Sequence, residues 1–82
     1  MHRVVYVKPL EDLTLEVRFD DGTAGIVSLK ERIVGPVFQP LVDPEEFRKV
    51  FIDEFGVVAW PNGADLAPDA LYDRLRSASS AA

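Results

Sequence analysis

The sequence feature that most constrains the fold is the alternation of apolar and polar side chains from Leu13 to Phe19. A period of two with one polar face is typical of an antiparallel strand that is buried on one side only. Asp20-Asp21-Gly22 follows directly, and an Asp-Gly step between two strand-like runs is a strong hairpin signal in which the glycine supplies a positive φ. We therefore predict that the chain turns back at Gly22 into a second strand.

Two further strands are expected to pair with this one. Arg3 to Lys8 are rich in β-branched and aromatic side chains and precede Pro9, which cannot donate to a ladder, so we expect an edge strand here. The strand after Gly22 has two registers open to it. A two-residue loop points Ile26 into the core, whereas a three-residue loop with a glycine bulge points Val27 inward. Both residues are apolar, and the sequence does not decide between them.

In the middle of the chain, prolines limit the predicted helices to short pieces. Ser28, with Glu31 three positions on, predicts a helix start, and Gly35-Pro36 ends that helix. Residues 37–41 lie between two prolines, and we expect a helical turn or an extended loop that covers one end of the sheet.

The rest of the chain predicts a helix, a second hairpin and a last helix. Asp43 caps a helix of about two turns, with Pro44 at its first position and Glu46 completing a capping box. The elements that follow are strands at 51–54 and 57–60, a tight turn at Asn62-Gly63, and a helix that opens at Pro68.

The predicted order is β-β-β-α-α-β-β-α, which makes the fold class α+β. We expect a small antiparallel sheet of about five strands, with the helices packed on one face. A chain of 82 residues allows a single domain. We place this compact domain at residues 1–76 and expect residues 77–82 to fray, because the SASSAA tail has nothing to bury.

The acidic composition limits the functions that the chain can have. Fourteen acidic against nine basic residues give a net charge of −5. The attraction that drives binding to a phosphate backbone is therefore missing, and we expect no direct nucleic-acid binding. The chain has no cysteine, which fits a reducing cytoplasm. No apolar run approaches the ~20 residues of a membrane span and no signal peptide opens the sequence, so we expect a cytoplasmic protein that contacts no membrane.

No set of side chains suggests an enzyme or a bound cofactor. His2 is the only histidine, and beside the initiating methionine it lacks the rigid setting of a catalytic base. The serines have no adjacent base, and no glycine-rich phosphate loop is present. Asp65, Asp69 and Asp73 recur every four residues, but turn-making and capping account for them better than cation binding does. We therefore expect neither catalysis nor a metal site.

The segment from Trp60 to Asp65 most suggests a binding role. Tryptophan and tyrosine are favoured interface anchors because they bury a large area and keep a polar group. Our candidate interaction residues are Trp60, Asn62, Asp65 and Tyr72. The alternative is structural: Trp60 fills the core, Asn62 turns the chain, and Asp65 bonds free N–H groups at the helix start.

Three segments together resemble one family. They are V-x-P-L-x-D-x-x-L-x-V-x-F-D-D-G at 7–22, G-P-V-F-x-P-L-x-D-P-E-x-F at 35–47 and W-P-N-G-A-D-L-x-P-D-x-L-Y at 60–72. With these the chain is similar to the small bacterial family named domain of unknown function 2442. The resemblance implies a compact α+β domain without a known activity. It also implies a link to toxin–antitoxin-type systems, because some members look like neighbours of such genes.

The sequence departs from the family pattern at Ala67, where a serine normally caps the last helix. Loss of that cap should cost about 1 kcal/mol unless Asp65 substitutes for it.

We therefore expect a non-enzymatic protein-interaction module. Its acidity would speed the encounter with a basic partner, and the partners that we consider are a basic toxin-like protein and a second copy of the chain in a homodimer. The surface to look for is an exposed apolar patch or a bare strand edge beside Trp60. The alternative is a small-ligand or cation-binding domain, which predicts a pocket with convergent polar groups in the region from Asp53 to Tyr72.

Overall fold

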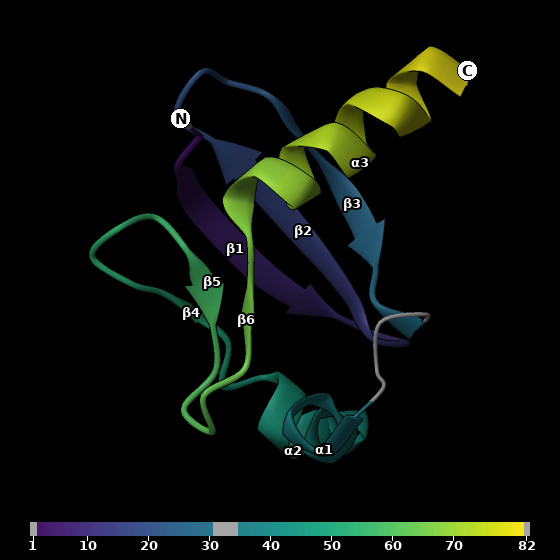
Figure 1. Cartoon of the computed structure of the whole chain (residues 1–82). Coiled ribbons are helices and arrows are strands. Elements are labelled where there is room, and N and C mark those ends of the chain that lie inside the picture. The colour runs from purple at the N-terminus through teal and green to yellow at the C-terminus, as the bar shows by residue number, and fades with distance from the viewer. Residues whose placement is uncertain (1, 31–34, 82) are drawn as a thin grey trace.

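The computed structural model describes residues 2–30 and 35–81 and shows helices packed against antiparallel strands (Figure 1). This confirms the α+β class. In chain order the elements are β1 (Val4–Leu10), β2 (Thr14–Phe19), β3 (Ala24–Ser28), α1 (Gly35–Phe38), the 3-10 helix η2 (Gln39–Val42), α2 (Pro44–Phe47), β4 (Phe51–Ile52), β5 (Val58–Ala59), β6 (Asp65–Leu66) and α3 (Pro68–Ala81). Helix α3 includes most of the tail that we expected to fray, and fraying in solution stays a prediction.

The strands form two sheets of three strands each, in the orders β1-β2-β3 and β4-β5-β6. The prediction of one sheet with about five strands is therefore wrong. The sequence does not reveal β6, because a strand of two residues has no alternation to detect. The two sheets share no ladder. The β4–β5 turn meets β1 through a backbone bond from the Val4 amide to the Gly56 carbonyl, at 3.0 Å.

The β2–β3 hairpin decides the register that the sequence left open. The Phe19 amide donates to the Thr23 carbonyl at 2.7 Å, and the Gly22 amide donates to the Phe19 carbonyl at 3.0 Å. Three residues therefore form the loop, with Gly22 at a φ of 91°, as in a hairpin with a glycine bulge. Val27 accordingly lies in the core with 4% of its surface exposed, whereas Ile26 is 62% exposed.

The same turn closes both hairpins of the second sheet. It spans residues 53–57 and 60–64, and in each case the first amide donates to the last carbonyl at 2.9 Å. Gly56 and Gly63 occupy the bulge position, with φ values of 78° and 97°. The predicted turns are confirmed, but the strands beside them are shorter than expected, because each loop takes three residues and the ladders between the loops hold only two pairs.

Gly35 and Pro36 do not end a helix. Both lie in helix α1, which the structure describes from Gly35 to Phe38, and η2 follows it directly. The predicted stop is therefore wrong. The helix predicted from Ser28 falls mainly on residues 31–34, outside the described residues.

The predicted cap of α2 is confirmed. The Asp43 carboxylate accepts from the Glu45 amide at 3.0 Å, and Pro44 takes the first helical position. The helix has one turn instead of two. Phe47 is buried and Val50 packs against the core, as the helical spacing predicts.

One face of the first sheet carries the core. Helix α3 crosses this face, while the second sheet and the helices of residues 35–47 lie to one side and at one end (Figure 1). Leu75 of α3 approaches β3 closely at Gly25. The buried side chains are Val4, Leu15, Val17, Phe19, Val27, Leu29, Leu41, Phe47, Val58, Trp60, Ala64, Leu66, Leu71 and Leu75. Within the described residues, no helix is long and apolar enough to cross a membrane.

Candidate functional site

Trp60 lies in the core and offers almost no surface to a partner. Only 2% of it is exposed, and its indole Nε1 donates to the Phe47 carbonyl at 2.9 Å. The two rings are also neighbours, with centroids 5.8 Å apart. This placement agrees with the structural alternative, in which Trp60 fills the core. Its hydrogen bond fixes α2 against the second sheet.

Asn62 and Asp65 are exposed at the outer end of the second sheet. The Asn62 side-chain oxygen accepts from the Ala64 amide at 3.1 Å, which stabilises the turn before β6. Asp65 lies on β6, opposite Ala59. The fourth candidate, Tyr72, makes its contacts with a different part of the molecule.

Tyr72 lies half-buried between the N-terminus and the β2–β3 hairpin. Its ring stacks on His2, with centroids 3.7 Å apart and planes inclined by 9°, and it meets Phe19 edge-on at 5.1 Å. Its hydroxyl donates to Asp21 Oδ2 at 2.6 Å and accepts from Thr23 Oγ1 at 3.3 Å. Thr23 and Asp21 are 49 and 51 residues from Tyr72 in sequence, so no local pattern could have predicted this cluster.

The hydrogen bond from Tyr72 shifts the titration of Asp21. That bond, together with the bond from the Thr23 amide, lowers the pKa of the Asp21 carboxyl to about 2, because both donors favour the charged form. His2 approaches a second carboxylate, with Nε2 at 4.0 Å from Asp69 Oδ1. With an ionised acceptor and no activated nucleophile, the arrangement ties α3 and the N-terminus to the hairpin.

The acidic residues of 53–73 do not converge on a cation site. Within the described residues, no group of three or more His, Cys, Asp or Glu side chains is placed so that it could hold a metal ion. Asp53 instead uses one oxygen, Oδ1, to accept from the amides of Phe55 at 2.8 Å and Val57 at 3.0 Å. It therefore stabilises the β4–β5 turn.

An open groove of about 690 Å³ lies between the β1–β2 turn and the helices η2 and α2. It is outside the region from Asp53 to Tyr72, where the small-ligand hypothesis expected a pocket. The residues that line it are Pro9, Leu10, Glu11, Asp12, Leu13, Val42, Pro44, Phe47 and Arg48.

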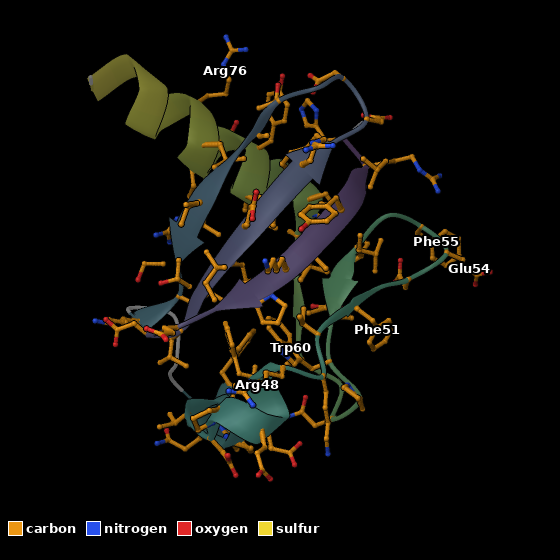
Figure 2. The ribbon with its side chains drawn as sticks, turned by 180° about the vertical axis from the view of Figure 1, so that it is seen from behind. Arg48, Phe51, Glu54, Phe55, Trp60 and Arg76 are labelled. Atoms are coloured by element: carbon orange, nitrogen blue, oxygen red, sulfur yellow. The ribbon has the colours of Figure 1, made fainter. Side chains whose placement is uncertain are left out.

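The β4–β5 hairpin presents two aromatic side chains to solvent. Phe55 is 68% exposed and Phe51 is 43% exposed. Figure 2 shows both on the outer side of the hairpin together with Glu54, whereas Trp60 lies inside. The exposure of Phe55 could have been predicted, because Phe55 directly precedes the glycine of a hairpin turn and the middle of such a loop points away from the core. The sequence analysis did not include Phe55 among the candidate interaction residues.

This hairpin is held firmly against the first sheet. The Gly56 carbonyl accepts from the Val4 amide at 3.0 Å, and the Glu54 carbonyl accepts from the Arg3 guanidinium, also at 3.0 Å. Together with the two bonds to Asp53, these contacts fix the loop that carries Phe55. We refer to Phe51, Glu54 and Phe55 as the hairpin surface.

Comparison with known proteins gives a family but no activity. Neither the curated proteins nor the solved structures contain a match to the chain. The sequence profile of a family described as "Protein of unknown function (DUF2442)" matches residues 4–77. The matched range includes both sheets and most of α3, and it confirms the resemblance found in the three sequence segments. The chain therefore belongs to the DUF2442 family.

Proposed function

We propose that the protein is a non-enzymatic protein-interaction module that contacts its partner through the hairpin surface. The observation that carries the proposal is the pair of exposed aromatic rings, Phe51 on β4 and Phe55 on the loop that follows, in a hairpin fixed by hydrogen bonds. Exposure of these apolar rings to water is unfavourable, and the free energy falls when a partner covers them. Because the loop is already ordered, binding costs less conformational entropy than ordering a flexible segment would.

The charge of the chain favours a basic partner. Glu54 lies between the two rings in sequence, and the whole chain carries −5. A basic protein would be attracted over a distance and would then place apolar groups on the rings. A basic, toxin-like protein in the cytoplasm is the partner that we propose to look for first.

The test is a pull-down from native cell lysate with the full chain as bait, followed by binding measurements with the purified partner. The double variant Phe51→Ser, Phe55→Ser should lose at least about 90% of the captured partner, because hot-spot aromatics dominate binding. Circular dichroism checks that the variant is folded. Val42→Ser is the matched control, since Val42 is also an exposed apolar residue, at 52%, and lies in the groove instead.

The control also tests the second candidate function. The groove favours a small apolar ligand or an apolar peptide segment, because most of its lining is aliphatic, aromatic or proline. If Val42→Ser fails to capture the partner and the double variant still captures it, the partner binds in the groove and not on the hairpin surface. The pull-down could instead capture no protein, while a compound from a small-molecule library raises the melting temperature of wild type but not of Val42→Ser. That result would replace the proposal with ligand binding in the groove.

A further inference from the structure

We infer that the chain forms a homodimer in which β3 pairs with β3 of a second copy to give a continuous six-stranded sheet. The inference rests on the outer edge of the first sheet, and it is independent of the hairpin surface. Strand β3 is an edge strand of the order β1-β2-β3. No other strand of the described residues pairs with its outer side.

The hydrogen-bond pattern of β3 leaves backbone groups free at this edge. The loop bond to Thr23 and the bond from the Leu29 amide to the Leu13 carbonyl, at 2.8 Å, show that the odd-numbered residues face β2. Since bonding alternates in an antiparallel ladder, Ala24 and Ile26 direct their N–H and C=O groups outward. No residue of the described chain bonds to these four groups.

The two edges of the sheet differ in how they are protected. Strand β1 carries Lys8 and Pro9 on its edge, and the β4–β5 turn covers its start through the Val4–Gly56 bond. Charge, proline and covering loops are the usual means of preventing strand addition. Strand β3 has the sequence Ala-Gly-Ile-Val-Ser, with no charge and no proline, and its Ile26 is 62% exposed. Strand β1 also exposes an aliphatic residue, Val5 at 55%, but only the β3 edge lacks charge, proline and a covering loop.

Charge at the two ends of β3 favours an antiparallel pair. The acidic loop with Asp20 and Asp21 precedes the strand. At its other end the Arg74 guanidinium donates to the Ser28 carbonyl at 3.1 Å, and Arg74 makes no ion pair with a described residue. Antiparallel pairing places the acidic loop of each copy beside Arg74 of the other, whereas parallel pairing would place like charges together. The second copy is thus complementary to the first.

We place the two-fold axis at Ile26, which brings the two exposed Ile26 side chains together and pairs the free groups of Ala24 with the outward groups of Ser28, whose carbonyl also accepts from Arg74. Ile26 then lies opposite Ile26 of the second copy, and Ala24 lies opposite Ser28, as a two-fold axis requires. Helix α3 continues past β3 on the inner face (Figure 1). In an antiparallel strand pair both inner faces are on the same side, so the two copies of α3 meet over the join and add to the buried area.

Analytical ultracentrifugation of the full chain tests the dimer. We expect wild type to sediment as a dimer, and Ile26→Pro to weaken the association about tenfold or more, because two backbone hydrogen bonds across the axis are lost. Proline at position 26 removes only an outward N–H, so the β2–β3 ladder stays intact. Ile26→Thr keeps both the N–H and the branched shape, and should remain a dimer.

A cysteine cross-link provides a second measurement that does not depend on the proline variant folding. The chain has no cysteine, and residues opposite each other in such a pair have Cα atoms about 5.5 Å apart, within the roughly 4.4–6.8 Å that a disulfide spans. Ile26→Cys should form a covalent dimer under mild oxidation, whereas Val42→Cys at equal concentration should not. A wild type that stays monomeric at millimolar concentration, or equal cross-linking of the two cysteine variants, would overturn the inference. Neither result would bear on the hairpin surface.

Discussion

Tyr72 shows how one side chain can join parts of the chain that are distant in sequence. Its ring contacts His2 and Phe19, and its hydroxyl bonds to Asp21. These groups belong to the N-terminus, to β2 and to the hairpin loop, while Tyr72 belongs to α3. A single hydroxyl therefore contributes to holding the helix on the sheet.

The Tyr72 hydroxyl should make stability depend on pH in the acid range. Because the pKa of Asp21 falls from the usual 3.8 to about 2 on folding, the unfolded chain binds a proton first as pH drops. The stabilisation by ionised Asp21 is complete above about pH 4 and is lost as pH falls toward 2. In Tyr72→Phe the pKa of Asp21 should rise toward its usual value, measured by carboxyl NMR titration. Tyr6→Phe is the control and should leave it unchanged; an equal change in both variants would contradict the assignment.

Ala67 is a position where the chain is less stable than it needs to be. The Leu71 amide donates to the Ala67 carbonyl at 3.1 Å, which places Ala67 at the N-cap of α3. Within residues 2–30 and 35–81, no amide of the first turn of α3 donates to the exposed Asp65 carboxylate, so Asp65 does not replace the missing cap. Ala67→Ser should raise the free energy of unfolding by about 1 kcal/mol, measured by urea denaturation. Ala67→Val supplies no cap oxygen and should bring no gain. A gain of the same size in both would show that capping is not the cause.

At the scale of elements, one turn type is used three times. Gly22, Gly56 and Gly63 all have positive φ values, in loops that close the β2–β3, β4–β5 and β5–β6 hairpins. The three loops differ in their surroundings. A Cβ atom at Gly22 or Gly63 would meet nothing within 4 Å, whereas at Gly56 it would lie 3.0 Å from the Arg3 Cα and 2.8 Å from the Arg3 Cβ.

Alanine substitutions should therefore separate backbone strain from packing. Gly22→Ala and Gly63→Ala should each cost about 1–2 kcal/mol, the price of a left-handed conformation for a residue with a side chain. Gly56→Ala should cost at least about 1 kcal/mol more, because the added methyl also pushes against the Arg3 backbone. Thermal unfolding of the three variants measures this. If all three variants lose the same free energy of unfolding, the β4–β5 turn of Gly56→Ala must move away from β1 at little cost.

At the scale of the whole molecule, both sheets and the helices share one core, while the proposed contacts lie on separate parts of the surface. Trp60 directly follows β5 of the second sheet, bonds to the carbonyl of Phe47 at the end of α2, and packs in the cluster that includes the inner face of the first sheet. The hairpin surface and the β3 edge belong to different sheets. One chain can therefore dimerise and still present Phe55 to another protein.

Trp60 and Phe55 should respond in opposite ways to substitution. Trp60→Phe should lower the free energy of unfolding by about 2 kcal/mol or more, because it opens a cavity in the core and removes the indole bond to the Phe47 carbonyl, which then keeps only the longer bond from the Val50 amide, at 3.3 Å. Phe55→Ala should change stability by no more than about 0.5 kcal/mol and should act on partner binding. Urea denaturation followed by circular dichroism measures both. A large loss in Phe55→Ala would place that ring in the fold and remove the basis of the hairpin surface.

The sequence by itself determined the features that depend on a few neighbouring residues. The alternation from Leu13 to Phe19 predicts β2 because a strand exposes every second residue to the same side. Asp43-Pro44 predicts the cap of α2, and Asp-Asp-Gly predicts the turn after β2, because each is a local hydrogen-bond pattern. Three linear segments likewise identify the family.

The tertiary structure decided everything that depends on distant contacts. Two apolar residues, Ile26 and Val27, compete for one core position, and only the bonds across the loop select Val27. Whether Trp60 faces a partner or the core depends on the carbonyl of Phe47, thirteen residues away. The division into two sheets depends on how the β4–β5 turn meets β1. These outcomes are set by packing between segments, which no short window of sequence contains.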